Sequence, residues 1–142
     1  MQNIDISIVS WSDKQSELTS VRRAVFIEEQ NVPENIEQDG KDSDFCHVLA
    51  TDKEGKPIGT ARMDKEGKIG RMAVLREYRG RGVGRKMLRV VMDWGRLNGI
   101  THFLVSAQIG AVEFYQKMGF EPFGEEFEEA GIKHVNMKIK VV

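Results

Sequence analysis

Three glycines lie within five residues in the segment Arg79-Gly80-Arg81-Gly82-Val83-Gly84. An apolar strand pattern over 69–75 precedes this segment, and an amphipathic helix pattern follows it from about residue 82 to residue 98. Glycine permits sharp turns and leaves backbone N–H groups uncovered, and a helix N-terminus adds partial positive charge. The segment therefore predicts a strand–turn–helix unit whose turn can cradle a phosphate or a pyrophosphate.

The residues around this turn are strongly basic, although the chain as a whole is nearly neutral. The chain has 21 basic and 22 acidic residues. Against the single acid Glu77, the segment contains Arg76, Arg79, Arg81, Arg85, Lys86 and Arg89. A basic segment in a neutral protein favours a small anionic ligand over nucleic acid, whose partners are usually basic overall. A solvated, arginine-rich helix face is the alternative, which charge alone does not exclude.

Length and composition predict one domain over 1–142, with enough residues to bury a core. No apolar run approaches the ~20 residues of a membrane span, and the N-terminus lacks a signal-peptide pattern. We therefore expect a cytoplasmic protein with no membrane or nucleic-acid partner. Cys46 is the only cysteine and lies in an apolar run, which predicts a reduced, buried thiol and not an acyl carrier.

The hydrophobic pattern predicts seven strands and about four helices. Strands are expected at 4–8, 45–51, 57–63, 69–75, 103–107, 120–127 and 134–141. Helices are expected from Ser12, which with Gln15 resembles a capping box, and over 82–98 and 111–118. The acid-rich segment 34–44 is read as a short helix or a loop. The apolar run 103–107 predicts a strand covered on both faces. The strand–helix–strand unit over 69–107 predicts one parallel, right-handed crossover, and the rest of the sheet is expected to be antiparallel or mixed.

Two familiar phosphate-binding loops fit the glycine segment poorly. A P-loop requires Gly-Lys followed by Ser or Thr, whereas Gly84 is followed by Arg85-Lys86-Met87. A dinucleotide fingerprint requires a third glycine where Arg85 stands, and an acidic residue ~20 positions later that the sequence does not supply convincingly.

A third pattern, Arg/Gln-x-x-Gly-x-Gly/Ala, is met by Arg79, Gly82 and Gly84, and it resembles the acetyl-CoA pyrophosphate loop of the GNAT acetyltransferase superfamily. The later block Phe114-Tyr115-Gln116-Lys117-Met118-Gly119-Phe120 resembles the F-Y-x-x-x-G-F helix and strand of the same superfamily. The resemblance implies an α/β (α+β) GNAT-like single domain with a mixed, mostly antiparallel seven-stranded sheet. It also implies acetyl-CoA as co-substrate and no metal.

The resemblance assigns the cofactor contacts to three places. The pyrophosphate would be bound by the loop Arg79, Gly80, Arg81, Gly82, Val83, Gly84 and Arg85. The pantetheine arm would lie beside the preceding strand, at Met72, Ala73 and Val74. Gln108 stands where many relatives carry an asparagine that contacts the cofactor. For Gln108, a loop glutamine satisfied by the protein itself is the competing interpretation.

Tyr115 aligns with the tyrosine that commonly assists departure of the CoA thiolate in this superfamily. The competing interpretation is an aromatic side chain on the apolar face of Ala111, Phe114 and Met118. An unperturbed phenol has a pKa of about 10 and a thiol about 8.5, so full proton transfer to the thiolate is uphill. Tyr115 would therefore act mainly as a hydrogen-bond donor to the sulfur.

The segment 124–137 resembles the glyphosate-acetyltransferase-like members of the superfamily. In those enzymes a histidine matching His134 is the general base, and an arginine matching Arg71 binds an acidic substrate. A surface histidine is the competing interpretation of His134. Glu28, Glu29 and Asp39 are alternative bases, from a segment that often lines the acceptor site.

The first half of the chain, with Arg22-Arg23-Ala24-Val25-Phe26, resembles the acyl-homoserine-lactone synthases, which share this fold. That distant resemblance suggests a buried ion-pair frame of Arg23, Asp39, Asp42 and Arg62 that positions the acceptor pocket without performing chemistry.

The leading hypothesis is an N-acetyltransferase in which a small-molecule amine attacks the thioester directly in a ternary complex, with backbone N–H groups near 72–74 binding the oxyanion. A non-catalytic CoA-binding sensor or interaction module is the second hypothesis. A nucleic-acid partner is disfavoured by the near-zero net charge. Homodimers are common in the superfamily, so a homodimer is a possible assembly. The sequence leaves the acceptor amine unidentified.

Overall fold

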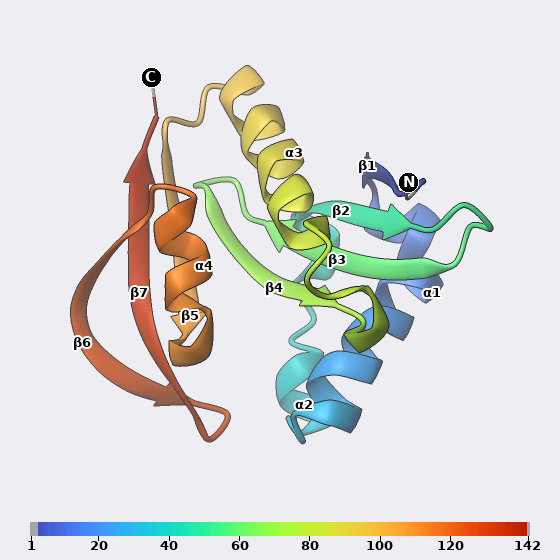
Figure 1. Ribbon diagram of the computed structural model, residues 1–142, viewed down its shortest axis with the longest axis horizontal. Coiled ribbons are helices and arrows are strands. Elements are labelled where there is room, and N and C mark those ends of the chain that lie inside the picture. The colour runs from blue at the N-terminus through green and yellow to red at the C-terminus, as the bar shows by residue number, and fades with distance from the viewer. Residues whose placement is uncertain (1–2, 142) are drawn as a thin grey trace.

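Seven strands form one mixed sheet in the order β1-β2-β3-β4-β5-β7-β6 (Figure 1). The structure is a computed structural model, and it describes residues 3–141. The strands are β1 (Asp5–Val9), β2 (Cys46–Thr51), β3 (Pro57–Met63), β4 (Lys68–Val74), β5 (His102–Gln108), β6 (Glu121–Glu129) and β7 (Ile132–Lys140). All neighbouring pairs are antiparallel except β4 and β5. The predicted mixed sheet with one parallel pair is confirmed.

Four α-helices accompany the sheet within residues 3–141. They are α1 (Trp11–Arg22), α2 (Glu34–Glu37), α3 (Val83–Leu97) and α4 (Val112–Lys117). A π-helical segment, η1 (Arg23–Glu29), continues α1, and short 3₁₀ turns occur at η2 (Asp42–Asp44), η3 (Arg76–Tyr78) and η4 (Ile109–Ala111). The segment 34–44 is thus one helical turn followed by a loop and a 3₁₀ turn.

The first helix begins earlier than the capping-box pattern predicted. Ser10, and not Ser12, is the N-cap of α1, because its Oγ accepts a hydrogen bond from the Asp13 N–H at 3.2 Å. A serine side chain in this position satisfies one of the N–H groups that a helix start leaves unpaired.

Helix α3 packs its apolar stripe on one face of the sheet. Val83 and Met87 share a buried cluster with Val48 and Ala50 of β2, and Leu88 and Val91 extend the core toward β5. Gly95 allows close packing there, since a Cβ atom at this position would lie 2.8 Å from Cε1 of Phe103. Helix α1 contacts β2, β3 and β4, and the alternate residue Leu49 is also buried. Both faces of the first half of the sheet are therefore covered.

The two parallel strands stay paired over only a short length. The ladder joins Lys68 to Leu104 and Ile69 to Val105, and beyond these pairs β4 and β5 move apart (Figure 1). The divergence leaves a wedge-shaped opening inside the sheet, at the carboxyl ends of both strands. Ligands in sheets with parallel strands commonly bind at such a position.

Strand β4 also departs from a regular ladder at the start of this opening. Thr60 pairs with Ala73 and Arg62 pairs with Gly70, so that two residues, Arg71 and Met72, stand opposite Ala61. Arg71 adopts a φ of 51°, in the left-handed region that side chains other than glycine rarely occupy. This is a β-bulge, a feature that re-aims side chains and backbone groups next to functional sites.

The sequence pattern of β5 was misleading about its environment. The run 103–107 predicted cover on both faces, but burial alternates along the strand, and Leu104 and Ser106 are only half-buried. On this face Ser106 borders the opening beside β4, whereas Leu104 lies where the two strands are still paired. Cys46 is likewise half-buried and not fully buried. Among the described residues, the helices are all too short or too polar to cross a lipid bilayer.

Candidate active site

The glycine loop presents a run of backbone amides at the start of α3. Gly80 and Gly82 have φ values of 76° and 81°, and Gly82 is the N-cap of the helix. In the described chain, the amides from residue 80 to residue 85 donate no hydrogen bond to another protein group, and the first bonded amide is that of Lys86, to the Gly82 carbonyl at 3.0 Å. A run of free N–H groups at a helix N-terminus is suited to bind an anion.

Side chains do not fill this loop. A Cβ atom on Gly80 would meet nothing within 4 Å, and one on Gly82 would have only Nη2 of Arg85 nearby, at 3.6 Å. At Gly84 the nearest atoms belong to Phe114, the residue before Tyr115, and to Val74 at the end of β4. The loop is therefore open to a ligand and adjoins the divergent strands, so the residues present fit a pyrophosphate.

Arg79 braces the loop instead of pointing into it. Its Nε donates to the Val74 carbonyl at 2.8 Å, and its two terminal nitrogens bind the two carboxylate oxygens of Glu29 at 2.8 and 2.7 Å. Its backbone N–H donates to the Arg76 carbonyl at 3.2 Å. The Arg79 guanidinium holds the pKa of Glu29 below its usual range. The Nε atom, both terminal nitrogens and the backbone N–H of Arg79 are thus all bound to other groups of the protein.

A cavity of about 580 Å³ occupies the wedge between β4 and β5 and extends toward η1 and α2. Residues that the sequence analysis proposed for the site line it together: Arg71, Met72, Gln108, Tyr115 and His134, with the alternative base Asp39 and with Arg62 of the ion-pair frame. Ala73 and Val74 do not line this cavity. Ala73 packs in the buried cluster of Val21 and Phe26, and the Val74 carbonyl is bound by Arg79.

Glu28 and Glu29 lie elsewhere. They line a smaller hollow of about 310 Å³ together with Leu75, Arg76 and Glu77, beside the glycine loop. Among the predicted substrate-binding residues, the main cavity therefore contains Arg71, while the two glutamates lie near the basic residues that precede α3.

Tyr115 projects from α4 and is 8% exposed. Its ring makes edge-to-face contacts with Phe114 and Phe120, and its hydroxyl group lies 3.8 Å from the sulfur of Met72. Burial raises the pKa of Tyr115 to about 12. With this raised pKa, the phenol keeps its proton. Because a thioether is a weak acceptor, the hydroxyl group can donate its hydrogen bond to a stronger acceptor in the cavity.

His134 lies near the start of β7 and is also 8% exposed, so it is not a surface histidine. Its Nδ1 lies 2.7 Å from the Ile132 carbonyl, and because a carbonyl only accepts, Nδ1 carries the proton. Nε2 then presents a lone pair, with a Glu129 carboxylate oxygen 4.0 Å away. The ring stacks on Phe127. In the neutral ring with this tautomer, Nε2 is the nitrogen that can accept a proton.

Gln108 ends β5 beside His134, with which it is paired in the sheet. Its side-chain N–H donates to the Oε1 atom of Gln30 at 2.9 Å. Gln30 also lines the cavity, and no pattern in the sequence singled it out. The two amides bridge the N-terminal helical segment and the end of the second parallel strand.

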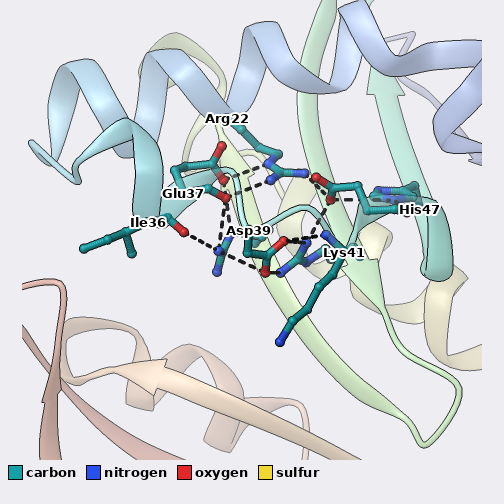
Figure 2. Close-up of polar contacts among 9 residues, drawn as sticks. Arg22, Ile36, Glu37, Asp39, Lys41 and His47 are labelled. Carbon is teal, nitrogen blue, oxygen red and sulfur yellow. Dashed lines mark hydrogen bonds and ion pairs between the residues drawn. The ribbon is translucent and has the colours of Figure 1, made fainter.

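A buried charged network forms the wall of the cavity next to α2 (Figure 2). Arg22 binds Glu37 at 2.9 Å and Asp42 at 2.6 Å, and Arg62 binds the same Asp42 oxygen at 2.8 Å. Arg62 also binds Asp39. Three arginines and three carboxylates thus compensate one another, with Arg71 as the third arginine.

The predicted frame was wrong in one member, since Arg22 occupies the place expected of Arg23. Arg22 is one helical turn from Leu18 and shares its buried face, whereas Arg23 points outward and pairs with Glu34. The helical spacing of Leu18 and Arg22 could have identified the correct arginine. Glu37, which the sequence analysis missed, accepts hydrogen bonds from both Arg22 and Arg71.

Arg71 connects the bulge to α2. Its Nε donates to Glu37 at 3.1 Å, and its Nη2 donates to the carbonyls of Glu37 at 3.1 Å and Ile36 at 3.2 Å. Burial and the nearby Arg62 lower the pKa of Arg71. The side chain remains 27% exposed and lines the cavity, so it places a guanidinium group on this wall.

The aspartates of the network are held in the ionised state. Hydrogen bonding from Arg62 keeps the pKa of Asp39 well below its usual range. Burial alone would raise the pKa of Asp42, but Arg22 and Arg62 outweigh it and the pKa is lowered. Within residues 3–141, His, Cys, Asp and Glu side chains form no group of three that could hold a metal ion.

Comparison with known proteins agrees with this geometry. A family model described as an acetyltransferase (GNAT) domain matches residues 12–141. YjcF of Bacillus subtilis, described as an uncharacterized N-acetyltransferase, is 38% identical over 121 residues, which cover 82% of this chain and 86% of YjcF. The chain therefore belongs to the GNAT acetyltransferase family.

Solved structures show the same fold over nearly the whole chain. A crystal structure of a Lactobacillus plantarum protein covers 98% of this chain and 99% of its own, with a TM-score of 0.90 and 26% identity. An acyl-CoA N-acyltransferase from Pseudomonas aeruginosa covers 96% of this chain and 99% of its own, with a TM-score of 0.82 and 28% identity. As a GNAT domain, the protein is an acetyltransferase, and its family uses acetyl-CoA.

Proposed function

We propose that this protein transfers the acetyl group of acetyl-CoA to a primary amine of a small molecule, by direct attack in a ternary complex. The observation that carries the proposal is the run of unpaired amides over residues 80–85, which adjoins the cavity containing Tyr115 and His134. The N-acetyltransferase and N-acyltransferase descriptions of YjcF and the Pseudomonas aeruginosa protein support an amine as the acceptor.

Binding of the donor is assigned to the loop and the bulge. The free amides of Gly80, Arg81, Gly82, Val83, Gly84 and Arg85 would bind the pyrophosphate, and the positive end of the α3 dipole would add to this attraction. Arg79 holds the loop against the Val74 carbonyl. When bound, acetyl-CoA supplies an acetyl thioester, whose carbonyl would lie near the backbone N–H groups of 72–74.

Proton transfers are assigned to the two catalytic candidates. An ammonium has no lone pair, so the acceptor must lose a proton, and Nε2 of His134 would take it. The hydroxyl group of Tyr115 would donate a hydrogen bond to the sulfur as negative charge develops on it. With a pKa of about 12, Tyr115 stabilises that charge without giving up its proton completely.

Recognition of the acceptor is assigned to the wall opposite these groups. Arg71 contributes positive charge to the cavity, which supports the finer resemblance to enzymes that bind acidic substrates. Gln108, paired with Gln30, narrows the opening near His134. Glu28 and Glu29 remain candidates only for an acceptor that reaches the smaller hollow. A cytoplasmic location and a homodimeric assembly also stay predictions.

Two measurements on the purified chain test the proposal. CoA and acetyl-CoA should raise the midpoint of thermal unfolding, and free thiol should form from acetyl-CoA only when an amine from a panel is added. Thermal stabilisation by CoA without thiol release for any amine would favour the non-catalytic CoA-binding module. Failure of CoA to change the unfolding midpoint would contradict the role of the loop.

A further inference from the structure

One lysine of the chain lies on the wall of the acceptor cavity near the charged network. Lys41 lines the same cavity as Met72, Tyr115 and His134. Lys41 is exposed, and within the described chain its ammonium group makes neither an ion pair nor a hydrogen bond. Figure 2 shows the Lys41 side chain extending away from the network. An unpaired primary amine therefore borders a cavity that we assign to amine acceptors.

The backbone of Lys41 is held in place. Its N–H donates to Oδ1 of Asp39 at 3.0 Å, and its carbonyl accepts from the N–H of Asp44 at 3.0 Å. The Asp39 carboxylate is in turn bound by Arg62 and lies 3.6 Å from Nη2 of Arg71. The base of the side chain is thus tied to Arg71, the residue that precedes Met72 at the bulge, while its flexible end is free to move.

A second lysine of the cavity differs in position. Lys68 also lines the cavity, but it begins β4 and pairs with Leu104 where the two parallel strands are still joined. From there to Met72 the strand rises about 13 Å, farther than a lysine side chain extends. Lys41, by contrast, is linked through Asp39 to Arg71, in the divergent part of β4.

We propose that Lys41 is acetylated by its own active site when no external acceptor is bound; this inference rests on the proposed function. The Lys41 ammonium gives one proton to Nε2 of His134, and its nitrogen then forms a C–N bond to the acetyl carbonyl. The C–S bond breaks and its electron pair leaves with the sulfur of CoA, which takes up the second proton that the Lys41 nitrogen loses as the amide forms. The products are Nε-acetyl-Lys41 and CoA, with no oxidant or metal required.

Proximity should make acetylation of Lys41 faster than acetylation of lysines that lie away from the cavity. An amine held in the same cavity as the thioester has a far higher effective concentration than one that must collide from solution. Acetylation removes the positive charge of Lys41 and adds bulk to the cavity wall. The modification should therefore reduce turnover of the external acceptor, so that acceptor and Lys41 compete for the same acetyl group.

The test uses the intact chain incubated with acetyl-CoA and no amine, followed by peptide mapping with mass spectrometry over time. Lys53 is the internal control, because it is exposed in the turn between β2 and β3 and lines neither hollow. Acetylation of Lys41 should be roughly tenfold or more faster than that of Lys53. Its rate should not depend on protein concentration, and Tyr115→Phe should slow it while leaving Lys53 unchanged.

Two variants complete the design. Lys41→Arg keeps the positive charge and should abolish the fast acetylation seen in the intact mass, whereas Lys53→Arg should keep it. A Lys41 rate no faster than that of Lys53, or one that Tyr115→Phe does not change, overturns the inference. Thiol release with the amine panel separates the two proposals. If an amine of the panel is acetylated while Lys41 stays unmodified, the proposed function stands and the inference about Lys41 is overturned. If neither reaction occurs, both proposals are overturned.

Discussion

The guanidinium Nε of Arg71 lies 3.1 Å from Oε2 of Glu37, and that same oxygen accepts a hydrogen bond from Arg22 at 2.9 Å. Glu37 is only 3% exposed. One carboxylate on a single-turn helix thus joins α1 to the bulge of β4, and through them fixes the wall of the acceptor cavity.

Glu37→Gln should destabilise the protein strongly, because it leaves two arginines without their shared carboxylate. Removing one partner of a buried ion pair typically costs about 3–5 kcal/mol of stability. Because the amide of the new Gln side chain can still accept hydrogen bonds, we expect a loss at the lower end of this range. Urea unfolding would measure this loss. Glu34→Gln is the matched control, since Glu34 pairs with Arg23 in solvent; an equal loss in both variants would contradict the role of burial.

Gly82→Ala should weaken CoA binding. Gly82 has a φ of 81° at the N-cap of α3, so a side chain strains the loop that carries the free amides. Gly99→Ala is a closely matched control, because Gly99 has a φ of 88° and open space around it, beyond the opposite end of α3. Both variants should lower the unfolding temperature, but only Gly82→Ala should lose the thermal stabilisation by CoA.

Tyr115→Phe should lower kcat by roughly 10²–10³-fold, the usual effect of removing a hydrogen bond to developing charge. The affinity for CoA should change little, because the ring packing on Phe114 and Phe120 is retained. Since burial raises the pKa of Tyr115 to about 12, ionisation of this group should not reduce the rate below about pH 11. Tyr78→Phe removes an exposed hydroxyl group that binds Asp52 and should leave kcat unchanged.

His134→Gln should slow acetyl transfer by roughly 10²–10⁴-fold near neutral pH, as expected for the loss of a general base. Raising the pH should restore part of the rate, because the acceptor amine then loses its proton to solvent. His102→Gln, on the exposed start of β5, is the control. A rate in His134→Gln close to that of the parent protein would assign deprotonation to another group or to water.

Stability should fall in acid through the charged network. Hydrogen bonding from Arg62 lowers the folded-state pKa of Asp39 below its unfolded value of about 3.9. The resulting stabilisation is fully present above that value and is lost as the pH falls toward the folded-state pKa. Asp39→Asn should therefore flatten the dependence of the urea midpoint between pH 5 and about 2, while Asp44→Asn, at an exposed position, should not.

Patterns that act locally in the chain predicted most of the fold. The alternation of Ile4, Ile6 and Ile8 placed the first strand to within a residue, and the glycine run predicted a helix from about residue 82, one residue before α3 begins at Val83. The parallel arrangement of β4 and β5 followed from the strand–helix–strand order. The clustering of Tyr115, His134 and Arg71 in one cavity also agrees with the family resemblance.

Other features depend on contacts between distant segments, which local patterns do not encode. The choice of Arg22 over Arg23 depends on the direction of the helix face, and the role of Glu37 depends on its meeting Arg22 and Arg71 from two other elements. The half-buried face of β5 includes Ser106, which lines the cavity, so the apolar run did not indicate full cover. Gln30 and Gln108 meet although 78 residues separate them in the chain.

The short ladder between β4 and β5 has a consequence for how the molecule holds together. Past Ile69 and Val105, each strand has a sheet neighbour on one side only, so the middle of the sheet contains two facing internal edges. An extended molecule with amide groups that settles between them would act as an eighth, removable strand and bond the two halves of the sheet across the gap. Hydrogen exchange of the amides in 70–74 and 106–108 should then report occupancy directly, with protection that appears on binding and disappears on release.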